Sequence, residues 1–279
     1  MAEGKVIDRC ALCQQPRELL KSHFLPAALY RLVRAANKPK PDPVLTTAAG
    51  HQHTSHQAWQ HLLCCDCEGQ FNRNGESWVM RHCYRGRGRF RLRDIIERCP
   101  PIGDAANGRI YSASCNPDIN TGQLVFFCTS VFWRASVRDW IASSQKYEAI
   151  CLGNAYQEQI REYLHGDREF PQNAAVTVIL SQLKFPHLAF NFPDTVRVES
   201  CHCHTLHIPG MTFQLMLGKQ VPEGTREGCI LRSPFHPIFV CKDGDARVQR
   251  NILRLMGKTD TSWGKYPLVE GFENLESKT

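Results

Sequence analysis

Two cysteine pairs organise this chain: Cys10-Ala-Leu-Cys13 and Leu62-Leu-Cys64-Cys-Asp-Cys67. Each pair presents two sulfurs from one tight turn, and four thiolates are the usual ligand set of a tetrahedral structural zinc ion. The two pairs lie far apart in the sequence, so one shared ion would join two distant segments. We therefore predict a structural zinc site whose ligands are Cys10, Cys13, Cys64 and Cys67.

The composition is that of a folded protein with a sizeable core. The chain has 279 residues, of which 42% are hydrophobic and 9% aromatic, within the range of ordinary globular domains. It contains no apolar run long enough to span a membrane, and its first residues lack the apolar segment of a secretion signal. We therefore expect a cytoplasmic protein, in which the 14 cysteines are metal ligands and small buried side chains rather than disulfides.

The positive charge is concentrated in the part that carries the cysteine pairs. The formal net charge is +7, and up to Arg98 the chain has 16 lysines and arginines against 9 acidic residues, whereas the remainder has 18 of each. An asymmetry of this kind favours a polyanionic partner for the N-terminal part. The alternative is that the excess charge only maintains solubility.

An arginine-rich stretch follows the second cysteine pair: Arg85-Gly-Arg-Gly-Arg-Phe-Arg-Leu-Arg93. In a β-strand, alternate side chains share one face, so five guanidinium groups would project together toward a phosphate backbone. Phe90 could stack on a base. The predicted nucleic-acid-binding residues are Arg85, Arg87, Arg89, Arg91 and Arg93; the alternative is a solvated edge or linker.

Periodicity and turn signals divide the chain into two parts, residues 1–98 and 108–279. In the first part a helix is predicted over residues 27–35, an exposed loop or irregular hairpin over 44–57, and a second helix from the second cysteine pair onward. On that second helix Glu68, Asn72 and Glu76 recur every fourth residue and would share one face.

The second part has no assigned role and shows a mixed pattern. Helices are predicted over residues 124–135, 154–164 and 246–256, and strands over 174–183, 212–217, 229–231 and 237–241. The expected fold class is α+β: an N-terminal treble-clef or ββα zinc module, followed by a mixed α+β domain with mostly antiparallel strands.

Other residues of metal-binding type are present. His51, His53 and His56 lie in the predicted loop, where a solvated role is favoured over metal binding. The run Cys201-His-Cys-His204, with His207, does not favour one shared ion, because neighbours in an extended chain point in opposite directions. The sequence contains no phosphate-binding loop, dinucleotide-binding fingerprint or nucleophile elbow.

At the cysteine pairs the chain resembles the HNH family of ββα-metal nucleases in its zinc-binding form. Ser22-His23-Phe-Leu-Pro26 follows the first pair, as a histidine and a proline do in that family, and Leu62-Leu-Cys64-Cys-Asp-Cys67-Glu68 is similar to the family's entry into its final helix. Within the family the motifs are most like those of a bacterial group with Ser-His-x-x-Pro and Leu-Leu-Cys-x-x-Cys-Glu. Trp133-Arg-Ala135 and Leu152-Gly153 match that group more loosely.

The resemblance implies a metal-dependent endonuclease that hydrolyses phosphodiester bonds, with DNA expected before RNA. His23 would be the general base that activates water, and Glu68 would be the second catalytic residue. Glu68, Asn72 and Glu76 would supply oxygen ligands for a catalytic Mg²⁺ or Mn²⁺ ion, and the four-cysteine zinc would be structural.

Three residues depart from the family pattern. Ser22 stands where an acidic metal ligand is usual, Trp59 where an asparagine is expected, and Glu68 where a histidine is common. The departures leave two other functions open. One is a non-catalytic, zinc-dependent nucleic-acid-binding protein in which His23 and Glu68 only support the fold. The other is an adaptor in a larger bacterial complex, such as an antiviral one, whose arginine stretch binds an acidic protein surface. A protein partner for the C-terminal domain is a separate expectation.

Overall fold

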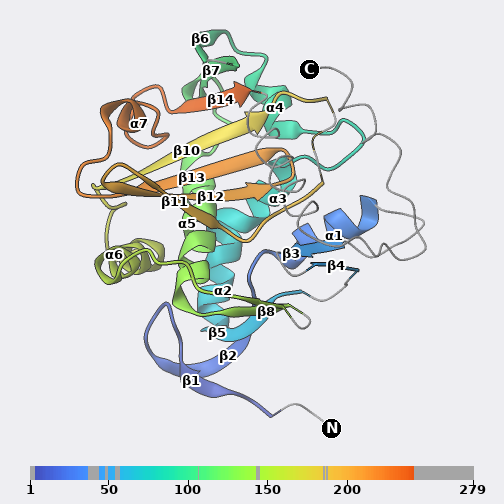
Figure 1. The fold of residues 1–279 in the computed structure, drawn as a ribbon, viewed down its shortest axis with the longest axis vertical. Coiled ribbons are helices and arrows are strands. Elements are labelled where there is room, and N and C mark those ends of the chain that lie inside the picture. Colours follow the sequence, from blue (N-terminus) through green and yellow to red (C-terminus); the bar gives the residue numbers. More distant parts are fainter. Residues whose placement is uncertain are drawn as a thin grey trace.

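The computed structural model describes residues 4–36, 44–47, 50–53, 57–105, 107–142, 145–184, 186 and 188–241. Within them the chain is a mixed α+β protein with one large sheet, a small sheet and a central helix between them (Figure 1). The predicted fold class is confirmed at this level: the strands are almost all antiparallel, and the four cysteines cluster. None of the helices in the described part is long and apolar enough to cross a membrane.

The small sheet carries the first cysteine pair. It has the order β1-β2-β5 and is antiparallel, with its strands at β1 (Ile7–Arg9), β2 (Pro16–His23) and β5 (Trp59–Cys64). Helix α1 (Ala27–Ala36) follows β2, as the sequence predicts, and β3 (Val44–Thr47) pairs with β4 (Gly50–His53) in a separate hairpin. A bulge between Leu20 and Lys21 shifts the register of β2 against β5, so the last residues of β2 face differently from those before the bulge.

A broken helix leads from the second cysteine pair toward the large sheet. Its parts are α2 (Cys65–Phe71), the π-helical turn η1 (Asn72–Glu76) and α3 (Ser77–His82), and α4 (Arg91–Ile96) comes after a loop. Gly75 lies in the π turn, where an added Cβ would lie 2.8 Å from the backbone nitrogen of Phe127. The helix widens where a neighbouring helix passes close to its backbone, and only glycine leaves room there.

The large sheet has seven strands in the order β11-β12-β13-β10-β14-β7-β6. Only β10 and β14 are parallel among its paired strands. The bounds are β6 (Pro101–Ala105), β7 (Gly108–Ser112), β10 (Ala174–Ser181), β11 (Asp194–Val198), β12 (Cys201–Ile208), β13 (Met211–Leu217) and β14 (Pro237–Cys241). The remaining described elements are η2 (Ala113–Cys115), β8 (Trp140–Ala142), β9 (Gln145–Tyr147), α6 (Asn154–His165) and α7 (Glu223–Glu227).

Helix α5 (Thr121–Val137) lies at the centre of the molecule. It crosses one face of the large sheet and packs along the broken helix on its other side (Figure 1). All of its residues from Leu124 to Ser136 are buried, which agrees with the predicted apolar helix and explains its lack of a polar face. One hydrophobic cluster includes buried residues from both predicted parts of the chain, on either side of residues 98–108.

Most of the predicted elements of the second part are present. Helices over 124–135 and 154–164 correspond to α5 and α6, and strands over 174–183, 212–217 and 237–241 correspond to β10, β13 and β14. The strand predicted over 229–231 is wrong, because those residues form a turn after α7. The helix predicted over 246–256 lies outside the described residues.

The arginine-rich stretch is not the predicted strand. Residues 85–89 form a tight turn closed by hydrogen bonds from Arg85 N to Arg89 O (2.9 Å) and from Arg89 N to Gly86 O (3.0 Å). Positive φ angles at Gly86, Arg87 and Gly88 turn the chain back, and α4 then begins at Arg91. Two glycines close together favour a left-handed turn over an extended strand.

Burial further changes the roles predicted for this stretch. Phe90 is fully buried, so it is not available to stack on a base. Arg93 is 7% exposed; its guanidinium donates to the carbonyls of Ser181 and Leu183 and lies over the Phe90 ring. Arg93 therefore stabilises the fold, whereas the other four arginines, Arg85, Arg87, Arg89 and Arg91, are exposed.

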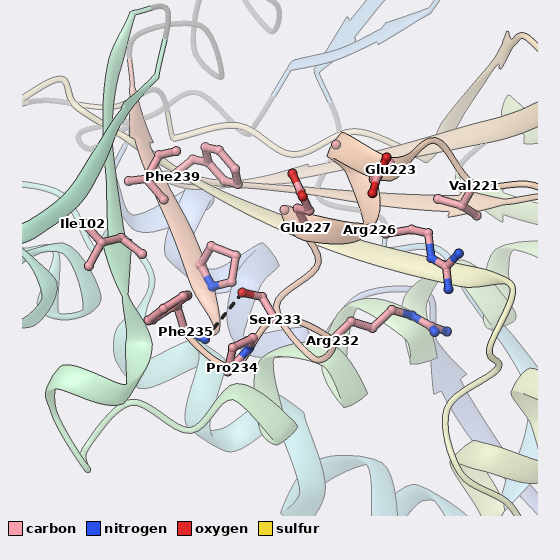
Figure 2. A pocket seen from close by; sticks show the side chains of 14 residues that line it. Ile102, Val221, Glu223, Arg226, Glu227, Arg232, Ser233, Pro234, Phe235 and Phe239 are labelled. Carbon is pink, nitrogen blue, oxygen red and sulfur yellow. Dashed lines mark hydrogen bonds between the residues drawn. The ribbon is translucent and has the colours of Figure 1, made fainter.

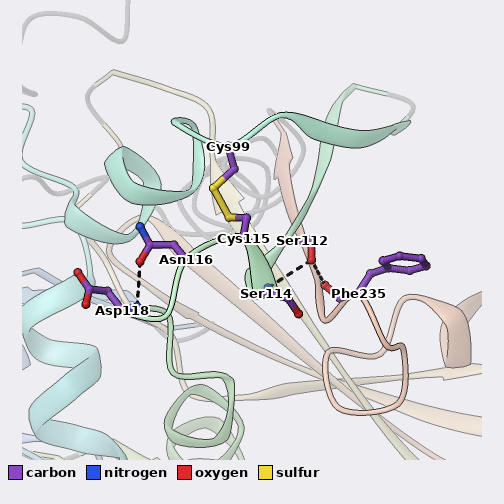
Figure 3. The surroundings of a disulfide bond; sticks show 7 residues. All are labelled: Cys99, Ser112, Ser114, Cys115, Asn116, Asp118 and Phe235. Carbon is purple, nitrogen blue, oxygen red and sulfur yellow. Dashed lines mark hydrogen bonds between the residues drawn. A yellow bond between two sulfur atoms is a disulfide. The ribbon is translucent and has the colours of Figure 1, made fainter.

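The expectation that the cysteines form no disulfides is also wrong at one place. Cys99 and Cys115 are bonded, and the bridge joins the start of β6 to the end of η2, beside the strand β7 (Figure 3). A sequence separation of 16 residues gives no spacing motif from which this pairing could be predicted. The other twelve cysteines are free thiols.

Candidate metal centre and its polar neighbourhood

The four predicted zinc ligands lie together. The sulfurs of Cys10, Cys13, Cys64 and Cys67 are all within 4.8 Å of one another, and those of Cys13 and Cys64 are 4.0 Å apart. Four sulfurs bound to one zinc ion at about 2.3 Å in a tetrahedron would lie roughly 3.8 Å apart. In the described part of the chain, no other group of three or more histidine, cysteine or acidic side chains has this proximity.

Local hydrogen bonds shape the first cysteine pair. Gln14 adopts a left-handed φ of 61° and donates its N–H to Cys10 O (2.9 Å), while Cys10 N–H donates to Gln15 O (2.9 Å). The turn is held against its surroundings by Arg161 on α6, whose guanidinium donates to Leu12 O at 2.6 Å. The backbone thus points both sulfurs of the pair inward.

The second pair spans a strand and a helix. β5 ends at Cys64, and Cys67 lies in the first turn of α2. The N–H of Cys64 donates to the sulfur of Cys10 at 3.3 Å, which links the two pairs directly.

Cys10 and Cys67 interact directly within the cluster. The hydrogen bond between their side chains lowers the pKa of Cys10 and raises that of Cys67. Zinc binds cysteine as the thiolate, so metal binding would release protons from the cluster. The donor set, its mutual distances and its burial therefore fit one structural zinc ion.

Ser22, the residue before His23, has a structural role. Its side chain is fully buried; its hydroxyl oxygen accepts the N–H of Leu63 at 3.1 Å, and it also hydrogen-bonds to the Glu68 carboxylate. A serine here joins β2, β5 and α2. An ionised carboxylate could accept from Leu63 but could not donate to Glu68.

Glu68 is partly withdrawn from solvent. Burial raises the pKa of its carboxyl, while Arg134 and the Ser22 hydrogen bond oppose that shift. Its Oε1 atom is buried and has no hydrogen-bond partner. Glu68 therefore has one enclosed carboxylate oxygen, while the residue as a whole is only half-buried.

Arg134 is the centre of the polar neighbourhood, although it was not among the predicted site residues. It is 1% exposed. Its Nη2 donates to Glu76 Oε1 at 2.6 Å and its Nη1 to His23 O at 2.8 Å, and its guanidinium lies 5.2 Å from the centre of the Phe71 ring. One α5 side chain thus connects the end of β2 with the π turn.

His23 is placed at the end of β2, where its side chain is half-buried. Burial lowers the pKa of its imidazole, Arg134 and Arg31 lower it further, and Glu76 opposes them. The Tyr30 ring of α1 lies 6.5 Å from the imidazole. At neutral pH the ring is therefore uncharged and able to accept a proton.

Two of the three predicted divalent-ion ligands have hydrogen-bond or ion-pair partners within the protein. Asn72 is exposed, and its Oδ1 accepts a hydrogen bond from the Ser77 hydroxyl at 2.7 Å. Glu76 is bound to Arg134, which leaves Glu68 as the one predicted ligand with a buried oxygen that has no partner. The π turn changes the helical geometry over Asn72–Glu76, so these positions do not follow the regular fourth-residue spacing of an α-helix.

The remaining histidine and cysteine groups form no second centre in the described chain. His51 and His53 belong to β4, where side chains are not described, and His56 lies outside the described residues. On β12, Cys201 and Cys203 share one sheet face while His204 lies on the other, against Phe132 of α5. The alternation expected for an extended chain therefore separates these groups.

A groove of about 1150 Å³ lies elsewhere, lined by residues of α7, of the turn that follows it, and of β6, β7 and β14. Figure 2 shows Ile102, Phe235 and Phe239 on one side of it, with Arg226 and Arg232 on the other. It shares no residue with the cysteine cluster or with the surroundings of Arg134.

One signal could have identified Arg134 from the sequence. It is the single charge in a 17-residue apolar helix, and a buried guanidinium needs an acidic or carbonyl partner. The sequence could not name that partner, because Glu76 lies 58 residues away.

Comparisons of the chain with protein-family models, with curated proteins and with solved structures find no match.

Proposed function

We propose that this chain is a nucleic-acid-binding protein built on a zinc-linked N-terminal module of the treble-clef type. The observation that carries the proposal is the arginine turn, residues 85–91, with exposed guanidiniums at Arg85, Arg87, Arg89 and Arg91. The turn is fixed beneath by buried Phe90 and Tyr84, so its charges are held in place at low entropic cost. Exposed arginines on a rigid loop suit contacts to phosphates.

The location of the net charge supports the same function. The whole excess of +7 lies within residues 1–98, the part of the chain that contains both the four cysteines and the arginine turn. Arg81, four residues before the arginine turn, is also exposed. Like charges gathered on one surface repel one another unless a polyanion neutralises them.

The test is binding to a fluorescent oligonucleotide at several salt concentrations. A variant with Arg85→Gln, Arg87→Asn and Arg89→Gln should bind at least tenfold more weakly and show a shallower salt dependence, by about one unit of slope for each arginine–phosphate pair removed. Asparagine is chosen at position 87 because it tolerates the positive φ found there. Exposed Arg197 on β11 supplies the control, Arg197→Gln. Equal binding by all three proteins would refute the proposal.

A second candidate, phosphodiester hydrolysis in the manner of HNH nucleases, is favoured by His23. Its imidazole is half-buried, uncharged at neutral pH and flanked by the cations Arg31 and Arg134. The wild type, His23→Ala and the control His165→Ala would be incubated with DNA and RNA in Mg²⁺ or Mn²⁺. Cleavage that disappears only in His23→Ala would establish hydrolysis. Binding without cleavage by any of the three would leave a non-catalytic protein.

A further inference from the structure

Trp59 stands directly beside His23 on the small sheet. The two residues are cross-strand partners in the β2–β5 ladder, and paired residues of an antiparallel ladder project from the same face. Trp59 is 40% exposed, whereas the other tryptophans of the described chain, Trp78, Trp133 and Trp140, are buried.

Two neighbours hold the Trp59 ring. The ammonium of Lys21 lies 4.5 Å from the centre of the indole, and the His61 ring meets it at 83° with centroids 5.5 Å apart. Trp59 is therefore positioned by contacts of its own face of the sheet, while a large part of its ring surface stays open to solvent.

The backbone beneath the ring is fixed as well. On one side of Trp59, Ala58 O accepts the N–H of Phe24 at 2.9 Å. On the other, the Gln60 side chain donates to Asp139 O at 3.0 Å. β5 then runs into the cysteine cluster at Cys64. The distance between Trp59 and His23 is thus set by the sheet and not by a loose loop.

We propose that Trp59, with Lys21 beside it, forms a stacking subsite for a nucleobase next to His23. This inference rests on the proposed nucleic-acid binding and assigns to it a second contact that is distinct from the arginine turn. An indole offers a flat apolar face on which any base can stack, and a lysine ammonium can move from an exposed ring to a neighbouring phosphate because the exposed cation–π contact is weak.

The salt dependence of binding distinguishes a stacking contact from a purely electrostatic one. Removing a phosphate contact changes the salt dependence of binding, whereas removing a stacking contact weakens binding equally at all salt concentrations. Binding at a base-stacking site therefore requires bases on the probe, whereas binding at the arginine turn requires only phosphates.

The test uses the full chain and two single-stranded probes of equal length, one with normal bases and one with an abasic run. Trp59→Leu should lower affinity for the normal probe about tenfold, with an unchanged salt slope and little effect on the abasic probe. Trp59→Phe should restore most of the affinity, because it keeps an aromatic face. Zinc content and melting temperature equal to wild type would show that both variants are folded.

Other results would contradict the proposed stacking subsite. Equal binding of the normal probe by wild type and Trp59→Leu, or an equal loss on both probes, would remove the stacking role while leaving the arginine turn intact. No binding of either probe by the wild type would refute the proposed function as well. A proline-rich peptide bound in a Trp59-dependent way, without nucleic-acid binding, would show that the exposed indole serves a protein partner.

Discussion

Arg134 Nη2 lies 2.6 Å from Glu76 Oε1, and both side chains are almost wholly inside the protein, 1% and 12% exposed. The pair joins α5 to the π turn, and the same guanidinium binds the carbonyl of His23. A buried cation therefore already neutralises an acid that the HNH resemblance would use for a divalent ion. The geometry of the polar neighbourhood is built around an arginine.

Breaking that pair should be strongly destabilising. Arg134→Met leaves Glu76 buried without its counter-charge, and we expect a loss of about 3–5 kcal/mol in the free energy of unfolding, measured by urea denaturation. The double variant Arg134→Met, Glu76→Gln should recover part of that loss, because no uncompensated charge remains. Arg138→Met, at the exposed end of the same helix, serves as the control. A loss no greater in Arg134→Met than in Arg138→Met would contradict the buried-pair interpretation.

Zinc binding can be tested by comparing substitutions at two nearby cysteines, Cys67 and Cys65. Cys67→Ser removes one of the clustered sulfurs, whereas Cys65→Ser changes an exposed thiol two residues earlier. We expect about one zinc ion per chain in the wild type and in Cys65→Ser, and loss of zinc with unfolding of the N-terminal module in Cys67→Ser, because the metal supplies folding free energy. Metal analysis and circular dichroism measure both effects. Zinc retained in full by Cys67→Ser would show that the cluster is not its ligand set.

Acid should destabilise the protein through His204. Burial lowers the pKa of this histidine to about 4, and its Nδ1 shares a hydrogen bond with the Thr195 hydroxyl. Between that value and the ordinary pKa near 6.5, the unfolded chain binds more protons than the folded one, so stability falls as pH decreases through this window. The loss would reach about 3 kcal/mol. His204→Gln should flatten the dependence between pH 6.5 and 4.

The matched control is His202→Gln, which changes an exposed histidine on the same strand. It should retain most of the acid dependence, since only a minor electrostatic influence on His204 is removed. Unfolding by urea at a series of pH values measures all three proteins. The same slope in the wild type and in His204→Gln would assign the effect to another group.

The disulfide between Cys99 and Cys115 should stabilise the edge of the large sheet. A closed loop of this length contributes about 3 kcal/mol in the chain-entropy account. We expect a reducing agent, or Cys115→Ser, to lower the melting temperature by several degrees. Cys151→Ser, which changes an exposed free thiol, should behave as the wild type. Counting thiols before and after reduction will show whether the bridge is present in the purified protein.

Much of the framework could be predicted because its signals are local. The C-x-x-C pairs carry their own ligand spacing, and α1, α5, α6 and β10 follow from hydrophobic periodicity and turn residues. The strand predicted for the arginine stretch was wrong because alternation alone resembles a strand. The glycines between the arginines allowed positive φ angles instead.

The roles of individual side chains needed the folded structure. Arg93 belongs to the same alternating run as Arg89, yet it is buried and donates to the carbonyls of Ser181 and Leu183. Ser22 is buried and accepts the backbone N–H of Leu63, 41 residues away in the sequence. Such roles depend on which distant segment packs against a residue, and no local pattern encodes that.

Local sequence was enough to predict that four cysteines in two pairs would meet and that α-helices and antiparallel strands would surround them, because ligand spacing and periodicity are properties of short segments. Packing between distant segments placed Arg134 against Glu76 and inserted a π turn between Glu68 and Glu76. It also left Trp59 open beside His23. These relationships arise where α5 and the small sheet meet, and only the folded chain brings those surfaces together.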